Sequence, residues 1–410
     1  MPEFLTLLPP NEALEKLASV ISWKLDEEII SSDQALKRVT FTPVTAPHPL
    51  PAFSRSTVDG YALRAVDTFG ASEGLPAYFR VAGEVPMGSA SDFEVKSGQC
   101  VLIHTGGMLP EGADAVIMLE YTQTARPGEI EVLRPAAQAE NVLIVGEDVK
   151  PGEEVIPAGK RLLPADIGGL MALGITDVSV CRQPRAAILS SGDEVVPPSS
   201  IPGPGQVRDI NSYSLSALVA DAGGIPVRYG ILPDRADALQ AAAEKALVEC
   251  DLVIITAGSS ASSRDLTAEV INRLGAPGVL VHGVNVRPGK PTILGVCRGK
   301  PVIGLPGNPV SALVIAGLFI PQVIDALGGV QKLPFRPSLL ARLAINLPSE
   351  SGREDWIPVH LDREPGGYRA DPIFGKSNLI FSLARADGLA RIPPDATGAA
   401  AGELIEVFLF

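Results

Sequence analysis

The stretch DLVIITAGSSASSRDLTAEVINRL, residues 251–274, decides the fold of the middle of this chain. Residues 252–255 form an apolar run of the length of a buried strand, and residues 266–274 have the apolar spacing of an amphipathic helix. The loop between them, residues 256–265, consists mostly of small and hydroxyl side chains. A strand, a loop and a helix in this order predict one βα unit of a parallel sheet.

The same alternation continues on both sides of this unit. We expect strands at residues 186–189, 226–230, 252–255 and 302–304, and helices at residues 212–222, 236–248, 266–274 and 310–327. Strands that alternate with helices of this length predict a doubly wound α/β domain with a mostly parallel sheet. We assign residues 181–330 to it.

The regions on either side of the α/β domain have different sequence patterns. Residues 46–145 contain short apolar runs broken by Gly, Pro and Asp, which predicts an inserted β-rich domain. An amphipathic helix that begins at Pro10, and a strand and helix around Pro164, predict an elongated mixed N-terminal domain of residues 1–45 with 146–180. Short alternating segments predict a small C-terminal β-barrel of residues 334–410. We therefore expect a multidomain α/β plus β protein.

Composition excludes several classes of partner. The formal net charge is -13, whereas nucleic acid and anionic membranes both require basic surface. The apolar segment 310–320, bounded by Pro309 and Pro321, is shorter than a membrane span, and the first ten residues lack the pattern of a signal peptide. The four cysteines lie far apart and indicate reduced thiols. We expect a cytoplasmic enzyme with a small-molecule substrate, no nucleic acid and no membrane.

Three loops after strands carry unusual residues. They are SSGDE at 190–194, TAGSSASSRD at 256–265 and LPGNP at 305–309. Ligands of open parallel sheets bind at the carboxyl ends of the strands, where the strand order reverses. Because each loop leaves a strand of the same sheet, we expect all three to meet at one cleft.

The chemistry of these loops suits a phosphate-bearing ligand. The backbone N–H groups of residues 256–265 and the following helix N-terminus can hold an oxyanion, although a GxGxxG dinucleotide motif is absent. Four acidic residues lie in loops that follow expected strands: Asp193, Glu194, Asp234 and Asp265. Carboxylates beside phosphate are typical of Mg²⁺ sites. Capping of the following helices is an alternative role for Asp234 and Asp265.

Two further motifs are candidates for binding. The turn RPGKP at 287–291 carries Arg287 and Lys290, which fit either an oxyanion clamp or a solvated basic turn. The segment PAFSRSTVDGYA at 51–62 brings Ser56 and Asp59 together in the β-rich region. The four histidines are scattered, which argues against a hydrolase triad.

Taken together, these motifs resemble the molybdenum insertase family, also called molybdopterin molybdenumtransferase, of the MoeA and gephyrin E-domain type. The matching segments span nearly the whole chain in order: PAFSRSTVDGYA at 51–62, HTGGMLPEGADAVIMLE at 104–120, GEDVKPGEEVIPAGKRL at 146–162, SSGDEV at 190–195, RPGKP at 287–291, LPGNPVSA at 305–312 and GKSNLIFSLARADGLARIP at 375–393. The resemblance implies that the α/β domain is MogA-like.

The resemblance also implies an activity. Enzymes of the family take adenylylated molybdopterin and molybdate, release AMP in a Mg²⁺-dependent step and leave the metal on the dithiolene. The implied catalytic residues are Asp59, Thr105, Glu194, Asp234 and Asp265, with Glu194, Asp234 and Asp265 as metal ligands. The implied substrate-binding residues are Ser56, Gly192, Asp193, Gly258, Ser260, Arg287, Lys290, Pro306, Gly307, Asn308 and Ser311.

The family also implies a homodimer whose site lies between the α/β domain of one subunit and the β-rich domain of the other. Contacts with a molybdopterin adenylyltransferase or with apo-molybdoenzymes are further expectations.

Two departures from the family pattern keep other functions open. Where the family has SGGxSxG, this chain has Ala257 and Ser262 in place of two glycines, and Arg287 stands where lysine is more usual. The alternatives are a paralogue that uses tungstate or a modified pterin, an adenylyltransferase, and a non-catalytic molybdopterin-binding scaffold. Molybdate and tungstate are nearly equal in size and charge, so the sequence does not distinguish them.

Overall fold

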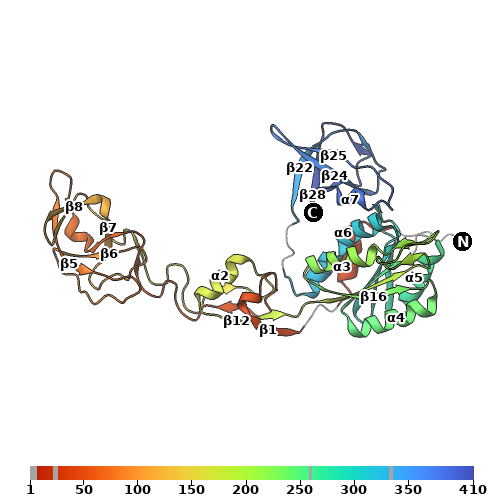
Figure 1. Cartoon of the computed structure of the whole chain (residues 1–410), viewed down its shortest axis with the longest axis horizontal. Helices are drawn as coiled ribbons and strands as arrows, with labels where there is room; N and C mark the ends of the chain where they lie inside the picture. The colour runs from red at the N-terminus through yellow and green to blue at the C-terminus, as the bar shows by residue number, and fades with distance from the viewer. Residues whose placement is uncertain (1–6, 22–25, 258–260, 332–335) are drawn as a thin grey trace.

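The computed structural model describes residues 7–21, 26–257, 261–331 and 336–410, with residues 261–265 described as backbone only. The chain is elongated (Figure 1). A β-rich domain lies at one end and a small mixed domain in the middle. The α/β domain and the C-terminal barrel lie together at the other end.

The α/β domain is built on a six-stranded sheet in the order β16-β13-β17-β21-β20-β18. The bounds are β16 (Ile225–Leu232), β13 (Arg185–Ser191), β17 (Leu252–Ala257), β21 (Lys300–Pro306), β20 (Ile293–Cys297) and β18 (Pro277–His282). The first four strands are parallel, and β20 and β18 join antiparallel. This confirms the expected mostly parallel sheet and adds two strands that the sequence reading missed.

Helices cover both faces of this sheet, as a doubly wound fold requires. They are α3 (Asn211–Asp221) and α6 (Pro309–Leu327) on one face, and α4 (Ala236–Glu249) and α5 (Ala261–Leu274) on the other. The buried strand residues divide accordingly: Ile188 packs with α3 and α6, whereas Leu189 packs with α4 and α5. This alternation is the period of two expected of a strand buried on both sides.

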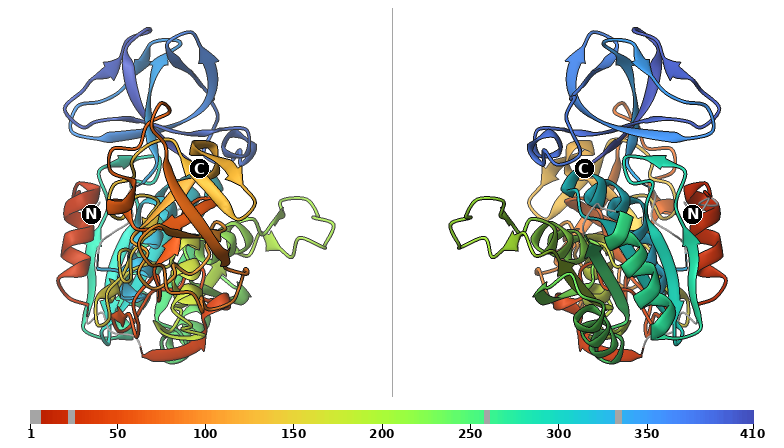
Figure 2. Two further views of the ribbon diagram at one scale, coloured as in Figure 1. Left: turned by 90° about the vertical axis from the view of Figure 1, so that its left-hand side faces the viewer. Right: turned by 90° about the vertical axis from the view of Figure 1, so that its right-hand side faces the viewer.

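Helix α1 (Pro10–Ala18) packs differently from the expectation. We predicted it within the mixed domain, but its apolar stripe, Ala13 and Leu17, joins the α/β core and contacts β18 and β20. Figure 2 shows α1, in red, along the side of the α/β domain. The stripe predicts that the helix is amphipathic, but not which apolar surface it covers.

The mixed domain brings together two segments that are far apart in sequence. Strand β1 (Glu27–Ser31) pairs antiparallel with β12 (Asp177–Cys181), and β2 (Val44–Thr45) with β11 (Glu154–Ile156). Helix α2 (Pro164–Ala172) buries Leu170 against this unit. The β-rich domain is therefore an insertion between β2 and β11.

The β-rich domain contains a six-stranded sheet with apolar clusters on both faces. Its order is β7 (Ala115–Met118), β4 (Gly60–Leu63), β6 (Gln99–Ile103), β5 (Ala77–Glu84), β9 (Glu129–Val132) and β8 (Thr122–Arg126). Smaller pieces are the strands β3 (Arg55–Ser56) and β10 (Val142–Leu143), and the 3₁₀ turns η2 (Ala65–Thr68) and η3 (Leu119–Tyr121); η1 (Ser32–Gln34) lies in the mixed domain.

The C-terminal domain is the expected small barrel. Its strands are β24 (Glu354–Glu364), β25 (Gly367–Pro372), β22 (Ser338–Leu343), β28 (Leu404–Leu409) and β26 (Gly388–Ile392), and pairing of β26 with β24 closes the ring. Strand β19 (Val286–Arg287) of the α/β domain pairs with β24. Two short pairs, β14 (Val195–Val196) with β15 (Val207–Arg208) and β23 (Leu347–Pro348) with β27 (Gly398–Ala399), and helix α7 (Phe381–Ala384) complete the described elements.

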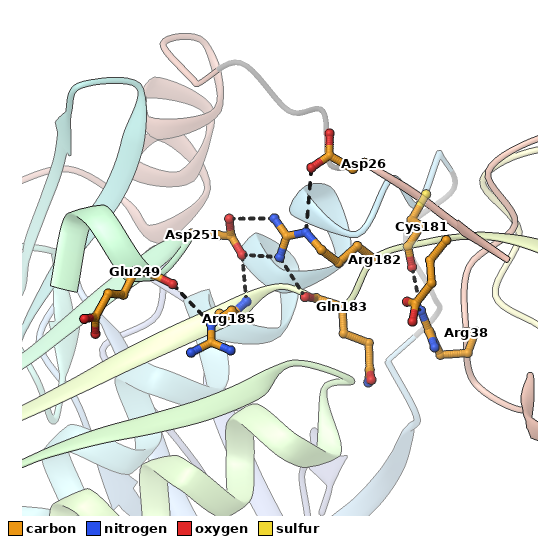
Figure 3. A network of polar contacts seen from close by, with 9 residues as sticks. Asp26, Arg38, Cys181, Arg182, Gln183, Arg185, Glu249 and Asp251 are labelled. Atoms are coloured by element: carbon orange, nitrogen blue, oxygen red, sulfur yellow. Dashed lines mark hydrogen bonds and ion pairs between the residues drawn. The ribbon is translucent and has the colours of Figure 1, made fainter. Parts of the chain in front are cut away.

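A network of polar contacts joins the mixed domain to the α/β domain (Figure 3). Arg182 follows β12 and donates from both terminal nitrogens to the carboxylate of Asp251, at 2.9 Å each. The backbone N–H of Arg185 donates to the same carboxylate at 2.8 Å. On the other side of the junction, Arg161 of the mixed domain pairs with the buried Asp325 of α6.

Helix α6 is long and apolar because it is a core helix. It is the one helix of the described chain with the length and hydropathy of a membrane span, and 72% of its apolar window is buried inside the protein. Pro321, which we expected to bound the apolar segment, lies inside the helix. The carbonyl that would accept its missing N–H belongs to Gly317. Arg336 donates to this carbonyl at 2.7 Å and to that of Leu318 at 3.1 Å.

Candidate active site

The three loops expected to converge do leave one edge of the sheet. Strands β13, β17 and β21 are parallel neighbours, and Ser190 lies beside Thr256, which in turn lies beside Leu305. The loops therefore start from one row of residues. Strand β13 pairs with β16 on one side and β17 on the other, so the strand order reverses here.

The loop after β13 holds Asp234 in place. The hydroxyl of Ser191, which is 5% exposed, donates to Asp234 Oδ1 at 2.8 Å. The backbone N–H of Asp234 donates to Asp193 Oδ1 at 3.2 Å. Helix α4 begins after Arg235 rather than after Asp234. The carboxylate of Asp234 is thus bound to the neighbouring loop, which favours a site role over the capping alternative.

The Glu194 side chain lies close to the backbone of Gly192. A Cβ at Gly192 would lie 2.9 Å from Glu194 Oε2 and 2.7 Å from the Val195 side chain. The glycine therefore leaves room for the Glu194 side chain to fold back over the loop. Glu194 and Asp193 are exposed, so both carboxylates are accessible to a ligand.

The structure describes the side chains of two of the three expected metal ligands. Within the described residues no group of three His, Cys, Asp or Glu side chains is close enough to hold a metal ion. The Asp265 side chain, our third expected ligand, lies outside the described residues, as do Gly258 and Ser260. Glu194 and Asp234 come from two neighbouring loops of one sheet edge and offer only oxygen atoms, which suits Mg²⁺.

The loop at the start of α6 is clamped from two sides. Asn308 donates to the hydroxyl of Ser377 at 3.0 Å, and the backbone N–H of Val310 donates to the carbonyl of Ser377 at 3.0 Å. Asn211, the first residue of α3, donates to the carbonyl of Gly307 at 2.8 Å. The C-terminal domain thus fixes the loop that contains Pro306 and Gly307, a contact that sequence reasoning missed.

Some polar atoms at the starts of α3 and α6 are buried. Ser311 is 6% exposed and Ser212 is 2% exposed. Among the described residues, Oδ1 of Asn211 and Oγ of Ser212 are buried without a hydrogen-bond partner. Unpaired buried polar atoms are costly, and a role in a functional site is one explanation for them.

The RPGKP turn presents two exposed cations, Arg287 and Lys290. It packs closely on α6: a Cβ at Gly289, whose φ is +112°, would lie 2.1 Å from the Ile315 side chain. Arg287 Nη1 lies 3.8 Å from Oδ2 of the buried Asp355 in the barrel. The turn is therefore rigid, and Lys290 is the freer of the two cations.

The expected residues of the β-rich domain form a second cluster. Asp59 Oδ1 accepts hydrogen bonds from the backbone N–H of Thr105 at 2.7 Å and from its hydroxyl at 3.1 Å. These two donors lower the pKa of Asp59 below its ordinary value. Ser56 is 2% exposed and its hydroxyl donates to the carbonyl of Val58 at 2.6 Å, so it shapes the loop that carries Asp59.

The two clusters are far apart within one chain. Asp59 and Thr105 lie in the β-rich domain at one end of the molecule, whereas the loops after β13, β17 and β21 lie in the α/β domain at the other (Figure 1). Within a single chain, these two clusters therefore do not form one site.

The domains of the chain match known family models in the same order. Residues 8–174 match the MoeA N-terminal region (domain I and II), residues 187–325 a probable molybdopterin binding domain, and residues 340–410 the MoeA C-terminal region (domain IV). The chain belongs to the MoeA family. This confirms the resemblance read from the motifs.

Individual MoeA relatives resemble the chain over nearly its whole length. A putative molybdopterin biosynthesis protein of Methanocaldococcus jannaschii is 35% identical, with 98% of both chains covered. The molybdopterin molybdenumtransferase of Bacillus subtilis is 30% identical over 98% of this chain and 94% of its own. A crystal structure of the MoeA protein of Pyrococcus horikoshii superposes with a TM-score of 0.85 at 34% identity, covering 99% of this chain and 100% of that one.

Proposed function

We propose that this MoeA-family protein is a molybdopterin molybdenumtransferase, which inserts molybdate into adenylylated molybdopterin and releases AMP during synthesis of the molybdenum cofactor. The observation that carries the proposal is that the SSGDE, Ser-rich and PGNP loops start from one row of parallel strand ends, where the sheet order reverses, in a chain whose curated relatives bear this name. Cleaving a phosphoanhydride requires charge neutralisation and a positioned water rather than a nucleophile.

Each half of the site has a distinct chemical role in this proposal. In the α/β domain, Glu194, Asp234 and Asp265 would hold Mg²⁺, which would neutralise phosphate charge and lower the pKa of a bound water. Arg287 and Lys290 bind the anionic groups of the pterin or the oxyanion. The helix N-termini at α5 and α6 add backbone N–H groups, with Asn308 and Ser311 at the start of α6. Gly258 and Ser260 are assigned to substrate binding from the sequence motif.

The half-site of the β-rich domain completes the site in a homodimer. An apolar groove of ≈ 1110 Å³ supports this part of the proposal, because it lies open along α3 and α6 beside the barrel. It is lined by Leu218, Leu313, Leu318, Trp356, Leu389 and Phe408, among others. Exposed apolar surface rimmed by polar residues is typical of interaction sites. In the proposed homodimer a second copy occupies this groove and supplies its Asp59 and Thr105 to the α/β loops.

The test is a reaction with purified protein, adenylylated molybdopterin, Mg²⁺ and either molybdate or tungstate, with AMP and metal-bound pterin as products. We expect both products, and the preferred oxyanion identifies the metal. Asp59→Asn and Glu194→Gln should each abolish insertion while circular dichroism stays unchanged. Unchanged activity in both variants would contradict these role assignments.

One structural feature keeps the alternatives open. Ala257, which replaces a family glycine, is 4% exposed at the end of β17, so its methyl group occupies space at the start of the Ser-rich loop. Binding of the pterin without AMP release would favour a scaffold or a changed substrate. Adenylylation of molybdopterin with ATP would favour an adenylyltransferase.

A further inference from the structure

His104 lies between two carboxylates beside the β-rich half-site. It follows β6 directly, and its Nε2 is 2.9 Å from Glu84 Oε1, while its Nδ1 is 3.7 Å from Asp59 Oδ1. Glu84 is the last residue of β5, and β5 pairs with β6 so that Glu84 lies beside Leu102. Strand β5, the residue after β6 and the loop before β4 therefore place the Glu84 carboxylate, the His104 imidazole and the Asp59 carboxylate in one row.

The geometry selects one protonation state of the ring. A neutral imidazole has one N–H, so one of its nitrogens would turn a lone pair toward a carboxylate. An imidazolium has a donor on each side. The hydrogen bond to Glu84 is the largest effect and raises the pKa of His104 above its ordinary value. Desolvation is the next largest and opposes the rise, while the charges of Glu84 and Asp59 add to it.

Among the described residues, no cation is a cause of the shifted pKa of His104. In the described part of the chain, the charged groups that act on His104 are Glu84 from β5 and Asp59 from the loop before β4. Thr105, its neighbour in sequence, is uncharged and donates twice to the same Asp59 oxygen that faces the ring. His104 and Thr105 thus approach Asp59 Oδ1 together.

We propose that His104 is a positioning residue of the insertase: tethered to Glu84, it acts with Thr105 to hold the Asp59 carboxylate in one orientation as an anion. The proposal rests on the proposed function, because Asp59 is assigned to catalysis there. It also assigns a task to Glu84, which anchors the ring. Loss of the proton from His104 turns a donor toward Asp59 into a lone pair, so the rate falls as the pH rises through the pKa of His104.

The first experiment follows the His104 ring by NMR in the full-length protein. The chain has four histidines, so the resonance is identified by its loss in His104→Gln. We expect His104 to titrate above the ordinary value of about 6.5. Glu84→Gln should lower its midpoint, and Asp59→Asn should lower it less because that contact is longer. Titration at or below the ordinary value, or no response to Glu84→Gln, overturns the proposal whatever the activity.

The second experiment measures insertion against pH. In the wild type, kcat should decline on the alkaline side with the midpoint seen by NMR. In His104→Gln the alkaline decline should disappear. Its kcat should fall about tenfold with little change in KM, as expected when a catalytic group is misplaced. His48→Gln, an exposed histidine whose recorded contact is the carbonyl of Pro49, is the matched control and should keep the wild-type profile.

The two experiments separate the proposal from the proposed function. An active wild type with an unchanged profile in His104→Gln overturns the role of His104 alone. A wild type that binds adenylylated molybdopterin without releasing AMP contradicts the proposed function, and the NMR titration then still decides whether Glu84 and Asp59 hold the ring as an imidazolium.

Discussion

At the scale of single residues, close approach decides which glycines the fold requires. Gly289 has φ +112°, and a Cβ there would lie 2.1 Å from Ile315 Cγ1 on α6. A side chain at this position is strained by its backbone and clashes with a buried branched residue. The turn between Arg287 and Lys290 therefore depends on glycine for its position against α6.

We predict that Gly289→Ala destabilises the α/β domain by about 2–4 kcal/mol, combining the strain of a positive φ with overpacking. Thermal unfolding followed by calorimetry measures the change. Gly299→Ala is the control: its φ is +79°, but a Cβ there meets open space, so about 1 kcal/mol is expected. Equal losses in the two variants would mean that the contact with Ile315 relaxes freely.

At the scale of elements, α6 shows how a proline is accommodated inside a buried helix. Pro321 lacks the N–H that would bond to the carbonyl of Gly317, and Arg336 donates to this carbonyl instead. Burial lowers the pKa of Arg336, partly offset by the charge of Asp325. The guanidinium thus substitutes for a backbone donor and ties the start of the barrel domain to the core helix.

A double-mutant cycle tests this substitution. We predict that Arg336→Met costs about 2–3 kcal/mol in the wild type, because it removes a charged donor from two part-buried carbonyls. In a Pro321→Ala background, which restores the backbone N–H, the same change should cost at least about 1 kcal/mol less. Unfolding by urea measures all four proteins. Additive losses would show that Arg336 stabilises the helix by another route.

At the scale of the whole molecule, two partly buried ion pairs lie at the junction of the mixed domain and the α/β domain, Arg182 with Asp251 and Arg161 with Asp325. Burial alone would raise the pKa of Asp251, but the hydrogen bonds from Arg182 and Arg185, with the charges of Arg182 and Lys300, bring it below its ordinary value. For Asp325 the balance is opposite: burial raises its pKa despite the charge of Arg161. The two ion pairs therefore respond to pH in opposite directions.

The Asp251 pair makes the junction sensitive to acid. Because its folded pKa is depressed, its stabilisation is present above the unfolded value of about 3.9 and is lost as the pH falls through the folded value. We predict that Asp251→Asn costs about 2 kcal/mol at pH 7, a figure reduced because Arg182 is a third exposed, and that the difference from wild type shrinks below about pH 4. Melting curves from pH 3 to 7 measure this. A difference independent of pH would contradict the ion-pair account.

The separation of the two half-sites also gives a prediction for the assembly. If each site combines Asp59 of one subunit with Glu194 of the other, Asp59→Asn and Glu194→Gln should each be inactive alone. Unfolded together and refolded, they should recover about a quarter of wild-type activity, because half of random dimers are mixed and each has one intact site. No recovery, with mixed dimers verified by distinct affinity tags, would place both residues in one chain's site.

The amino-acid sequence by itself determined the features that depend on local pattern. The alternation of apolar strands with amphipathic helices predicts the doubly wound domain, and the loops after β13, β17 and β21 predict the sheet edge where Glu194 and Asn308 lie. These features follow from side-chain periodicity and from the rule that parallel strands end on one edge. The motifs also identified the family.

Only the tertiary structure decided the features that depend on contacts between distant segments. The apolar stripe of α1 does not predict which hydrophobic core the helix packs against. Ser191 reaches Asp234 across 43 residues, and Glu84 reaches His104 across 20, so neither pair has a local signature. The same holds for the donor that Arg336 supplies to the carbonyl of Gly317. Periodicity describes one segment at a time, whereas the pairing of polar groups and the choice of packing partner belong to the folded chain as a whole.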